Sequence, residues 1–269
     1  MNGCRPNSGD SFERVTPPPA TQELLEEAVA LAVAAGKRTL NWFGTSTLGV
    51  DHKGDGTPVT DADRDAERFV REYLAERHPD DSVLGEEEAD TIGASARRWI
   101  VDPIDGTKAF TRGVPLYTTL VAVDDEHGPA VGVIAVPALD QVIFAGRGLG
   151  CFLDDSPARV SETTAIGDAC ITTSGFGPWS PEALASIHSA EPLLRTWGDA
   201  YGYSLVATGR ADAMIDPIAE LWDLAPMPVI ITEAGGNFTG LDGQQGADKG
   251  SGVATNGHLH SEVLALMNS

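Results

Sequence analysis

Residues 98–110 read RWIVDPIDGTKAF, and this stretch says most about the fold and chemistry of the chain. The apolar run Trp99–Val101 is typical of a buried strand. Two carboxylates, Asp102 and Asp105, follow three residues apart, with a proline between them and a glycine after them. The proline disfavours helical conformation in the residue before it, and the glycine lets a ligand approach the backbone closely. We therefore expect the strand to end in a turn suited to a hard cation and a bound anion.

Three further acidic positions add to this pair. Glu86 opens a Gly-Glu-Glu-Glu segment after a short apolar stretch, Asp63 lies at the start of an expected helix, and Asp223 follows a tryptophan at the start of another. Each has an ordinary alternative: Glu86 as a solvated loop acid, Asp63 as a helix cap, and Asp223 as an acid favoured by the helix dipole. For each residue alone the ordinary alternative is favoured. The functional interpretation depends on all of them occurring together.

The composition is that of a globular protein with many acids. The 269 residues are 42% hydrophobic, enough for a full core, and the formal net charge is -22. That charge argues against a nucleic acid or an anionic membrane as a partner. It would also repel a phosphorylated substrate, unless bound divalent cations reverse the local potential.

No apolar run approaches the ~18 residues that a membrane-spanning helix needs. Residues 1–20 lack the apolar centre of a signal peptide, and their proline, serine and glycine content predicts a flexible tail. Cys4, Cys151 and Cys170 are an odd number of thiols without metal-ligand spacing. We therefore expect the protein in the reducing cytoplasm.

The pattern of apolar residues predicts alternating helices and strands after the tail. This alternation indicates an α+β or layered α/β fold, in which residues 21–155 and 156–269 form two subdomains of one compact unit. The expected helices are at 21–43, 60–77, 180–190, from 198, from 223 and at 258–267, and the expected strands at 99–101, 117–124, 130–136, 141–146, 151–153, 170–174, 212–216 and 252–254.

These elements resemble the inositol monophosphatase-like family of magnesium-dependent phosphatases over residues 21–267. The order of four motifs carries the resemblance, because D-P-x-D alone would be weak. The resemblance implies the family's αβαβα sandwich and a phosphate monoester hydrolase. The matching residues are Val59-Thr60 with Asp63, Gly85-Glu86-Glu87, Trp99 to Thr107 with Phe110, and Trp222, Asp223, Ala225, Ile230 and Glu233 to Gly236.

Carried over residue by residue, the resemblance implies a site for two to three Mg²⁺ ions. Glu86, Asp102 and the backbone carbonyl of Ile104 would bind the first ion. Asp102, Asp105 and Asp223 would bind the second, and Glu86 would lie beside a weaker third. Mn²⁺ is an expected substitute for Mg²⁺, and Li⁺ an expected inhibitor. Magnesium prefers carboxylate oxygen, and no histidine and cysteine cluster competes for zinc.

The resemblance also implies how the attacking water and the phosphate are handled. Thr107 and Asp63 would form the proton-relay pair for a metal-held water. Asp105 and the backbone amides of Gly106 and Thr107 would hold the phosphate. The helix that follows Asp223 carries two prolines, and the deeper of them, Pro228, is expected to kink it.

The segments that flank these motifs look like the histidinol-phosphatase branch of the family. Inositol phosphatases usually place a small neutral residue where Asp199 stands, between Gly198 and Ala200. An acid there suits histidinol phosphate, which carries an ammonium and an imidazole, and Asp199 and Asp216 are the candidates for binding those groups. The alternative, that Asp199 is a helix N-cap after Gly198, has equal weight.

Four other functions stay open on the same fold. The enzyme could act on inositol monophosphate, or on fructose 1,6-bisphosphate or 3'-phosphoadenosine nucleotides. More remotely, the chain could be a catalytically silent regulator that binds metal or phosphate. The intact Asp63, Thr107 and metal carboxylates argue against a silent protein. The resemblance alone implies a homodimer.

Overall fold

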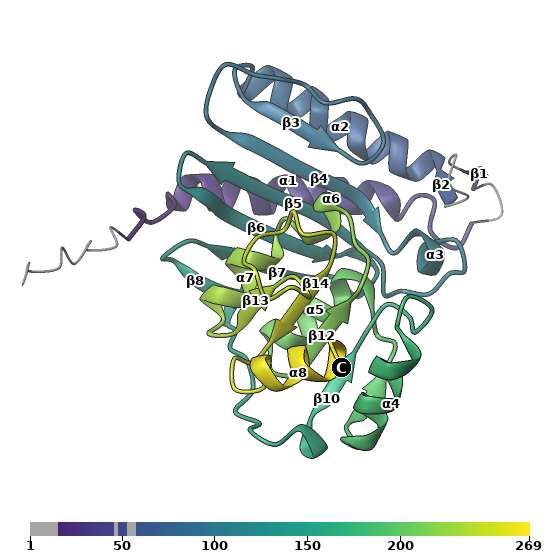
Figure 1. Cartoon of the computed structure of the whole chain (residues 1–269). Helices are drawn as coiled ribbons and strands as arrows, with labels where there is room; N and C mark the ends of the chain where they lie inside the picture. The colour runs from purple at the N-terminus through teal and green to yellow at the C-terminus, as the bar shows by residue number, and fades with distance from the viewer. Residues whose placement is uncertain (1–15, 46–47, 53–57) are drawn as a thin grey trace, which may run out of the picture.

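Helices and strands alternate along the chain in the computed structural model, which describes residues 16–45, 48–52 and 58–269 (Figure 1). The α-helices are α1 (Gln22–Thr39), α2 (Asp61–Arg77), α3 (Thr107–Phe110), α4 (Pro181–Ser189), α5 (Asp199–Ala207), α6 (Leu221–Leu224), α7 (Met227–Glu233) and α8 (His260–Met267). The strands are β1 (Val50–His52), β2 (Pro58–Thr60), β3 (Ser82–Gly85), β4 (Arg98–Asp105), β5 (Thr118–Asp125), β6 (Gly128–Val136), β7 (Gln141–Gly146), β8 (Gly150–Leu153), β9 (Ser156–Pro157), β10 (Cys170–Thr172), β11 (Leu193–Arg195), β12 (Ala213–Asp216), β13 (Asn237–Thr239) and β14 (Gly252–Thr255).

Two sheets separate three layers of helices. The larger sheet runs in the order β3-β4-β5-β6-β7-β8-β9, and the smaller in the order β11-β10-β12-β14-β13. Helices α1 and α2 cover the outer face of the larger sheet, α5 to α7 lie between the sheets, and α4 and α8 cover the far face of the smaller sheet (Figure 1). This arrangement confirms the expected αβαβα sandwich. The division of the chain near residue 155 remains a prediction about folding units.

The larger sheet is apolar on both faces because helices cover both. In β5, Val121 and Val123 pack toward α1 and α2, whereas Leu120 packs toward α5 and α7. Successive side chains of a strand point to opposite faces, so a continuous apolar run is what a sheet between two helical layers requires. Each such side chain contributes roughly 1.5–3 kcal/mol when fully buried.

Helices α1 and α2 begin where the sequence predicts, because each has a capping residue. The Thr21 hydroxyl accepts a hydrogen bond from the backbone N–H of Leu24 at 3.2 Å. Thr60 and Asp63 form a reciprocal capping box at the start of α2. Helix α1 ends at Thr39, four residues before the predicted end at Phe43. Asp63 therefore caps the helix, as the alternative interpretation proposed. The cap uses Oδ2 of its carboxylate, so Oδ1 is left for a second role.

The prolines after Asp223 act differently from the prediction. We expected one helix from residue 223 with a kink at Pro228, but α6 and α7 are separate helices with Pro226 between them. Neither proline has an N–H to bond the preceding turn, so the interruption comes at the first of them. Pro228 then lies in the first turn of α7, where a missing N–H has no intrahelical partner to lose.

The chain is held against the larger sheet before α1 begins. The backbone N–H of Ala20 donates to the Arg147 carbonyl at 2.8 Å, and Arg147 Nε donates to the Pro18 carbonyl at 2.8 Å. Two residues of the predicted tail are thus anchored, because Arg147 lies in the turn that joins β7 to β8. Residues 1–15 of that tail lie outside the described residues.

The expectations about membrane-spanning helices and about the cysteines can be compared with the structure. No helix in the described part of the chain has both the length and the apolarity that crossing a membrane would need. Cys151 is buried and Cys170 is partly exposed, and both are free thiols. Cys4 lies outside the described residues.

Glu233, part of the family motif that begins at Trp222, stabilises the turn between β7 and β8 from the helical layer. Its carboxylate accepts hydrogen bonds from the backbone N–H groups of Gly148 at 2.6 Å and Gly150 at 2.9 Å. Both glycines have positive φ, at 74° and 91°. The segment between β7 and β8 is therefore a tight turn, and Glu233 joins the middle helical layer to the larger sheet.

Candidate active site

A β-bulge in β4 places Asp102 and Asp105 on the same side of the sheet. Asp102 pairs with Leu120 and Asp105 with Thr118, so three steps along β4 match two along β5. In a regular strand, residues three apart point to opposite faces, and one extra residue restores a common side. The prediction that the strand ends in a turn after Val101 is therefore wrong: β4 continues to Asp105, and the turn begins at Gly106 with φ 80°.

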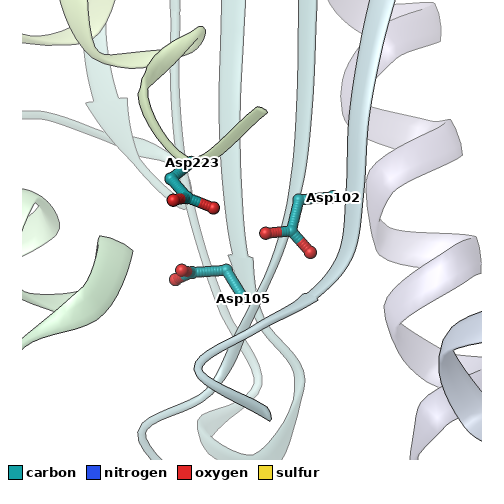
Figure 2. A group of neighbouring side chains, drawn as sticks. All are labelled: Asp102, Asp105 and Asp223. Carbon is teal, nitrogen blue, oxygen red and sulfur yellow. The ribbon is translucent and has the colours of Figure 1, made fainter. Parts of the chain in front are cut away.

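Asp223 completes a cluster of three carboxylates with this pair. One carboxylate oxygen from each of Asp102, Asp105 and Asp223 lies within 4.8 Å of the other two. Figure 2 shows Asp102 and Asp223 pointing toward one another, with the Asp105 carboxylate beneath that of Asp223. These residues come from β4 and α6, which are more than a hundred residues apart in the chain, and they form the cluster that the resemblance implies.

A backbone N–H holds one oxygen of each carboxylate in the cluster. The Ile104 N–H donates to Asp102 Oδ1 at 3.0 Å, and the Glu220 N–H donates to Asp223 Oδ2 at 2.8 Å. Asp105 Oδ2 accepts the N–H of Ala200 at 2.7 Å and the hydroxyl of Thr118 at 2.8 Å. The three side chains are thus oriented by the fold itself, with second oxygens left for a ligand.

Glu86 lies beside the cluster because β3 and β4 are parallel. Gly85 pairs with Val101, so the residue after each strand, Glu86 and Asp102, meet at the same edge. Burial is the largest cause of the raised pKa of Asp102, and the charge of Glu86 is the second. The Glu86 charge also raises the pKa of Asp223. Glu86 is not one of the three mutually close carboxylates, so it adjoins the cluster rather than forming its centre.

Burial and mutual repulsion disfavour the ionised form of these acids. Burial raises the pKa of Asp102 and Asp105 well above the usual range, and the neighbouring carboxylates raise both further. Burial also raises the pKa of Asp223 to about 6. Buried like charges of this kind are stable at neutral pH only when a cation balances them. An all-oxygen set of carboxylates fits Mg²⁺ or Mn²⁺.

Asp63 has one carboxylate oxygen bound and one without a hydrogen bond. Its Oδ2 accepts the Thr60 N–H at 2.7 Å and the Thr60 hydroxyl at 2.5 Å, whereas its Oδ1 is buried without a partner. Burial raises the pKa of Asp63 to about 7. The Thr107 hydroxyl donates to the Ile104 carbonyl at 3.0 Å, and among the described residues no hydrogen bond joins Thr107 to Asp63. The two residues of the expected relay pair are thus each hydrogen-bonded to another partner.

A cavity of about 460 Å³ opens beside the carboxylates. Its wall includes Asp105 and Asp223 from the cluster, the proposed substrate residues Asp199 and Asp216, and one cation, Lys108. The remaining lining residues are Ser174, Gly175, Gly177, Pro178, Ala200, Tyr203, Pro217, Ile218 and Ala219. The structure thus brings three of the four sequence-predicted substrate residues, Asp199, Ala200 and Asp216, to the same space as the metal-type acids; Gly198 directly precedes them.

Ser174 holds both substrate-type aspartates, and the sequence analysis did not identify it. Its hydroxyl accepts the Asp199 N–H at 2.8 Å, and its own N–H donates to Asp216 Oδ1 at 3.2 Å. A Cβ on Gly198 would lie 2.2 Å from Ser174 Cα, so only glycine allows this approach. No motif marks Ser174, because its role depends on strands β10 and β12 being neighbours.

Asp199 is not the helix N-cap that the alternative interpretation proposed. Gly198 takes that position, and Asp199 is the first residue of α5 with a left-handed φ of 52°. Its carboxylate lies over the turn after β4, because a Cβ on Gly106 would be 3.0 Å from Asp199 Oδ2. Burial raises the pKa of Asp199, and the nearby Lys108 lowers it. The left-handed backbone, which aspartate tolerates better than most residues, thus keeps this acid at the cavity wall.

This chain is similar over most of its length to proteins of the inositol monophosphatase family. A model of the inositol monophosphatase family matches residues 20–269. A Mycobacterium tuberculosis protein named histidinol-phosphatase is 42% identical over 251 residues, which cover 90% of this chain and 96% of that protein. A Rhizobium meliloti inositol-1-monophosphatase is 35% identical over 89% of this chain and 94% of its own length.

Solved structures share the fold over nearly the whole chain. The extragenic suppressor protein suhB from Bartonella henselae superimposes with a TM-score of 0.86 at 29% identity, covering 92% of this chain and 99% of that one. An IMPase of Thermotoga maritima gives a TM-score of 0.84 at 26% identity, covering 92% and 97%. The shared fold therefore covers 92% of this chain in both comparisons.

Proposed function

The chain belongs to the inositol monophosphatase family, and from that premise we propose that it hydrolyses L-histidinol phosphate to L-histidinol and phosphate in histidine biosynthesis. One observation carries the substrate assignment. The cavity beside the metal-type carboxylates is also lined by two further acids, the partly buried Asp199 and the buried Asp216. Identity of 38–42% to proteins named histidinol-phosphatase supports the same assignment.

We propose that the acids bind two to three Mg²⁺ ions, with Mn²⁺ as a substitute and Li⁺ as an inhibitor. Glu86, Asp102 and the Ile104 carbonyl would hold the first ion, and Asp102, Asp105 and Asp223 the second. When bound, Mg²⁺ supplies charge neutralisation for the phosphoryl oxygens and the leaving oxygen, and lowers the pKa of water. The carboxylates fit such ions because Lys108 is the only cationic side chain among the described residues that line the cavity, and one positive charge cannot balance four acids.

The proton and the phosphate are assigned to groups around the same turn. The free Oδ1 of Asp63 and its pKa of about 7 suit a proton acceptor at neutral pH. Thr107, at the start of α3, would pass the proton to it after leaving its hydrogen bond to Ile104. The N–H groups of Gly106 and Thr107 would bind the phosphate together with Lys108, which lines the cavity.

Asp199 and Asp216 would select the organic half of the substrate by charge. Histidinol phosphate is a cation at its amine end and an anion at its phosphate, so a site with metal on one side and acids on the other complements both. A cationic amine near a buried carboxylate makes a charge-assisted hydrogen bond. An inositol ring offers only neutral hydroxyls there and cannot balance the two charges.

Comparing phosphate release from several esters in the presence of MgCl2 tests the proposed substrate. We expect kcat/KM for L-histidinol phosphate to exceed that for inositol 1-phosphate, fructose 1,6-bisphosphate and 3'-phosphoadenosine 5'-phosphate by at least about tenfold, the effect of one retained charge-assisted hydrogen bond. Release of inorganic phosphate is the measurement. Equal or slower turnover of histidinol phosphate would reject it as the substrate while leaving the phosphatase assignment in place.

Asp199→Asn should lower activity selectively on the cationic substrate. Asparagine keeps the shape and tolerates a positive φ, but the charge-assisted hydrogen bond is lost, which predicts a ~10–100-fold drop in kcat/KM for histidinol phosphate. For inositol 1-phosphate we expect a change of no more than about threefold, within the usual context dependence of such effects. Asp168→Asn, an exposed acid, is the matched control. Equal losses on both substrates would show that Asp199 acts on the shared phosphate site and not on the organic half.

We also propose a homodimer and a cytoplasmic location. The resemblance to the family supports the first, and the free buried thiol of Cys151 is consistent with the second.

A further inference from the structure

Glu67 is a fully buried carboxylate on α2 that the proposed reaction does not use. Its side chain has a relative exposure of 0%, although an acid is almost never buried in this way without partners. It lies four residues after Asp63, so both acids extend from the same side of the helix. Burial of a carboxylate costs free energy unless both of its oxygens are hydrogen-bonded or paired with a cation, so the partners of Glu67 must compensate for that cost.

The partners of Glu67 are the backbone amides of the segment Glu86–Glu88, called here the acidic loop. The Glu87 N–H donates to Glu67 Oε2 at 2.8 Å, and the Glu88 N–H donates to Glu67 Oε1 at 3.1 Å. A Cβ on Gly85 would lie 2.2 Å from Glu67 Oε1, so any larger residue there would displace the Glu67 carboxylate from its present position. One side chain from α2 thus fixes the backbone directly after β3.

Arg71, one turn further along α2, ties the same loop to Glu67. Its Nε donates to Glu67 Oε1 at 2.8 Å, and its Nη2 donates to the Glu88 carbonyl at 3.0 Å. Its Nη1 donates to the Thr91 hydroxyl at 3.3 Å. The guanidinium therefore neutralises the buried Glu67 through Nε and binds the last residue of the acidic loop, Glu88, through Nη2.

Holding the loop opposes a repulsion that the site itself creates. Glu86 lies next to Asp102 and close enough to Asp223 for its charge to act on both. Three consecutive glutamates lie beside the buried Asp102 and the partly buried Asp223. An unrestrained loop would move away from these aspartates, because like charges at short range repel in a low dielectric. Two hydrogen bonds from loop N–H groups to Glu67 restrain the loop through its backbone and do not use the side chains of Glu86–Glu88.

We infer that Glu67, supported by Arg71, is a positioning residue that keeps the acidic loop where Glu86 can bind a cation. This role rests on the proposed metal-dependent function, because Glu67 acts on the cation only through Glu86. It follows that α2 serves the site twice, with Asp63 at its first turn and Glu67 at its second. Partners that orient metal ligands typically change metal affinity by 10–100-fold when they are replaced.

Glu67→Gln tests this role with little change in side-chain shape. The amide replaces one acceptor by a donor, so one loop N–H loses its partner. We expect hydrogen exchange of the amides of residues 86–88 to become at least about tenfold faster in the metal-free protein, and Mg²⁺ affinity, by calorimetric titration with MgCl2, to fall ~10–100-fold. The kcat should recover at saturating MgCl2, while the MgCl2 concentration for half activation rises.

Glu72→Gln is the matched control, because it removes the same charge from an exposed position on α2 and should change none of these values. If Glu67→Gln does not fold, Arg71→Lys replaces it, since lysine keeps the charge but cannot bind Glu67, Glu88 and Thr91 together. A folded variant with wild-type loop exchange and wild-type Mg²⁺ affinity would overturn the inference. If the wild type releases no phosphate but Glu67→Gln still loosens the loop and weakens Mg²⁺ binding, the proposed reaction fails and the positioning role stands.

Discussion

Asp102→Asn should abolish phosphate release, by about 10³-fold or more, without unfolding the protein. Asp102 is the one aspartate assigned to both ions, and metal ions stabilise a phosphoryl-transfer transition state by several kcal/mol, at 1.36 kcal/mol for each tenfold in rate. The asparagine has the same shape and can still accept the Ile104 N–H hydrogen bond at its amide oxygen. It removes one of the buried like charges, so the metal-free variant should be as stable as the wild type or more stable.

Phosphate release and urea unfolding in EDTA check the two halves of this prediction separately. Asp90→Asn is the control, because Asp90 is exposed and carries the same change of chemistry. Activity within tenfold of the wild type would contradict the metal assignment of Asp102. Loss of activity together with a large loss of stability in EDTA would instead show that Asp102 is needed for folding.

The metal-free protein should lose stability as the pH rises from about 4 to 7, and Mg²⁺ should restore it. Burial raises the pKa of Asp63 and Asp216 to about 7 and that of Asp223 to about 6, against 3.8 for an unburied aspartate. The folded state therefore binds more protons than the unfolded state in this range. The free energy of unfolding changes with pH in proportion to the protons bound by the unfolded state minus those bound by the folded state. This difference is negative here, so the free energy of unfolding falls as the pH rises, and each group contributes on the order of a few kcal/mol.

Mg²⁺ should reverse the effect most strongly at neutral pH, where the ion does not compete with protons for the carboxylates. At a concentration of 100 times Kd, a ligand that binds only the folded state adds about 2.7 kcal/mol. Urea unfolding at pH 5 and pH 7.5, in EDTA and in MgCl2, gives the four values needed. Stability in EDTA that rises over this range, or that MgCl2 leaves unchanged in the wild type at pH 7.5, would contradict a buried cation site.

Local structure was largely predictable where the signal lies within a few residues. Thr21 and Thr60 begin their helices as predicted, because a hydroxyl that caps an N-terminus acts within one turn. The strands at 117–124, 130–136 and 141–146 are confirmed as β5, β6 and β7, because each is a long apolar run. The short strands β1, β11 and β13 were not predicted, because three residues carry no period and their pairing partners decide their conformation.

Segments distant in the chain made other features unpredictable. The bulge that turns Asp105 to the side of Asp102 appears in the pairing of β4 with β5 and not in the spacing of the two acids. Ser174 and Glu67 have no motif around them, and each is identified only through the loop or helix that it holds. Asp63 was predicted either as a cap or as part of the relay, and only its two oxygens, one bound and one free, show that both roles are available.

The sequence by itself determined the types of residue at the site, the order of the motifs and most of the helices and strands, because these depend on neighbours along the chain. The tertiary structure alone decided which acids meet, since Asp102 and Asp223 come from β4 and α6 and become close only when the middle helical layer packs on the larger sheet. It also decided the direction in which their pKa values shift, because burial and the approach of like charges exist only in the folded chain.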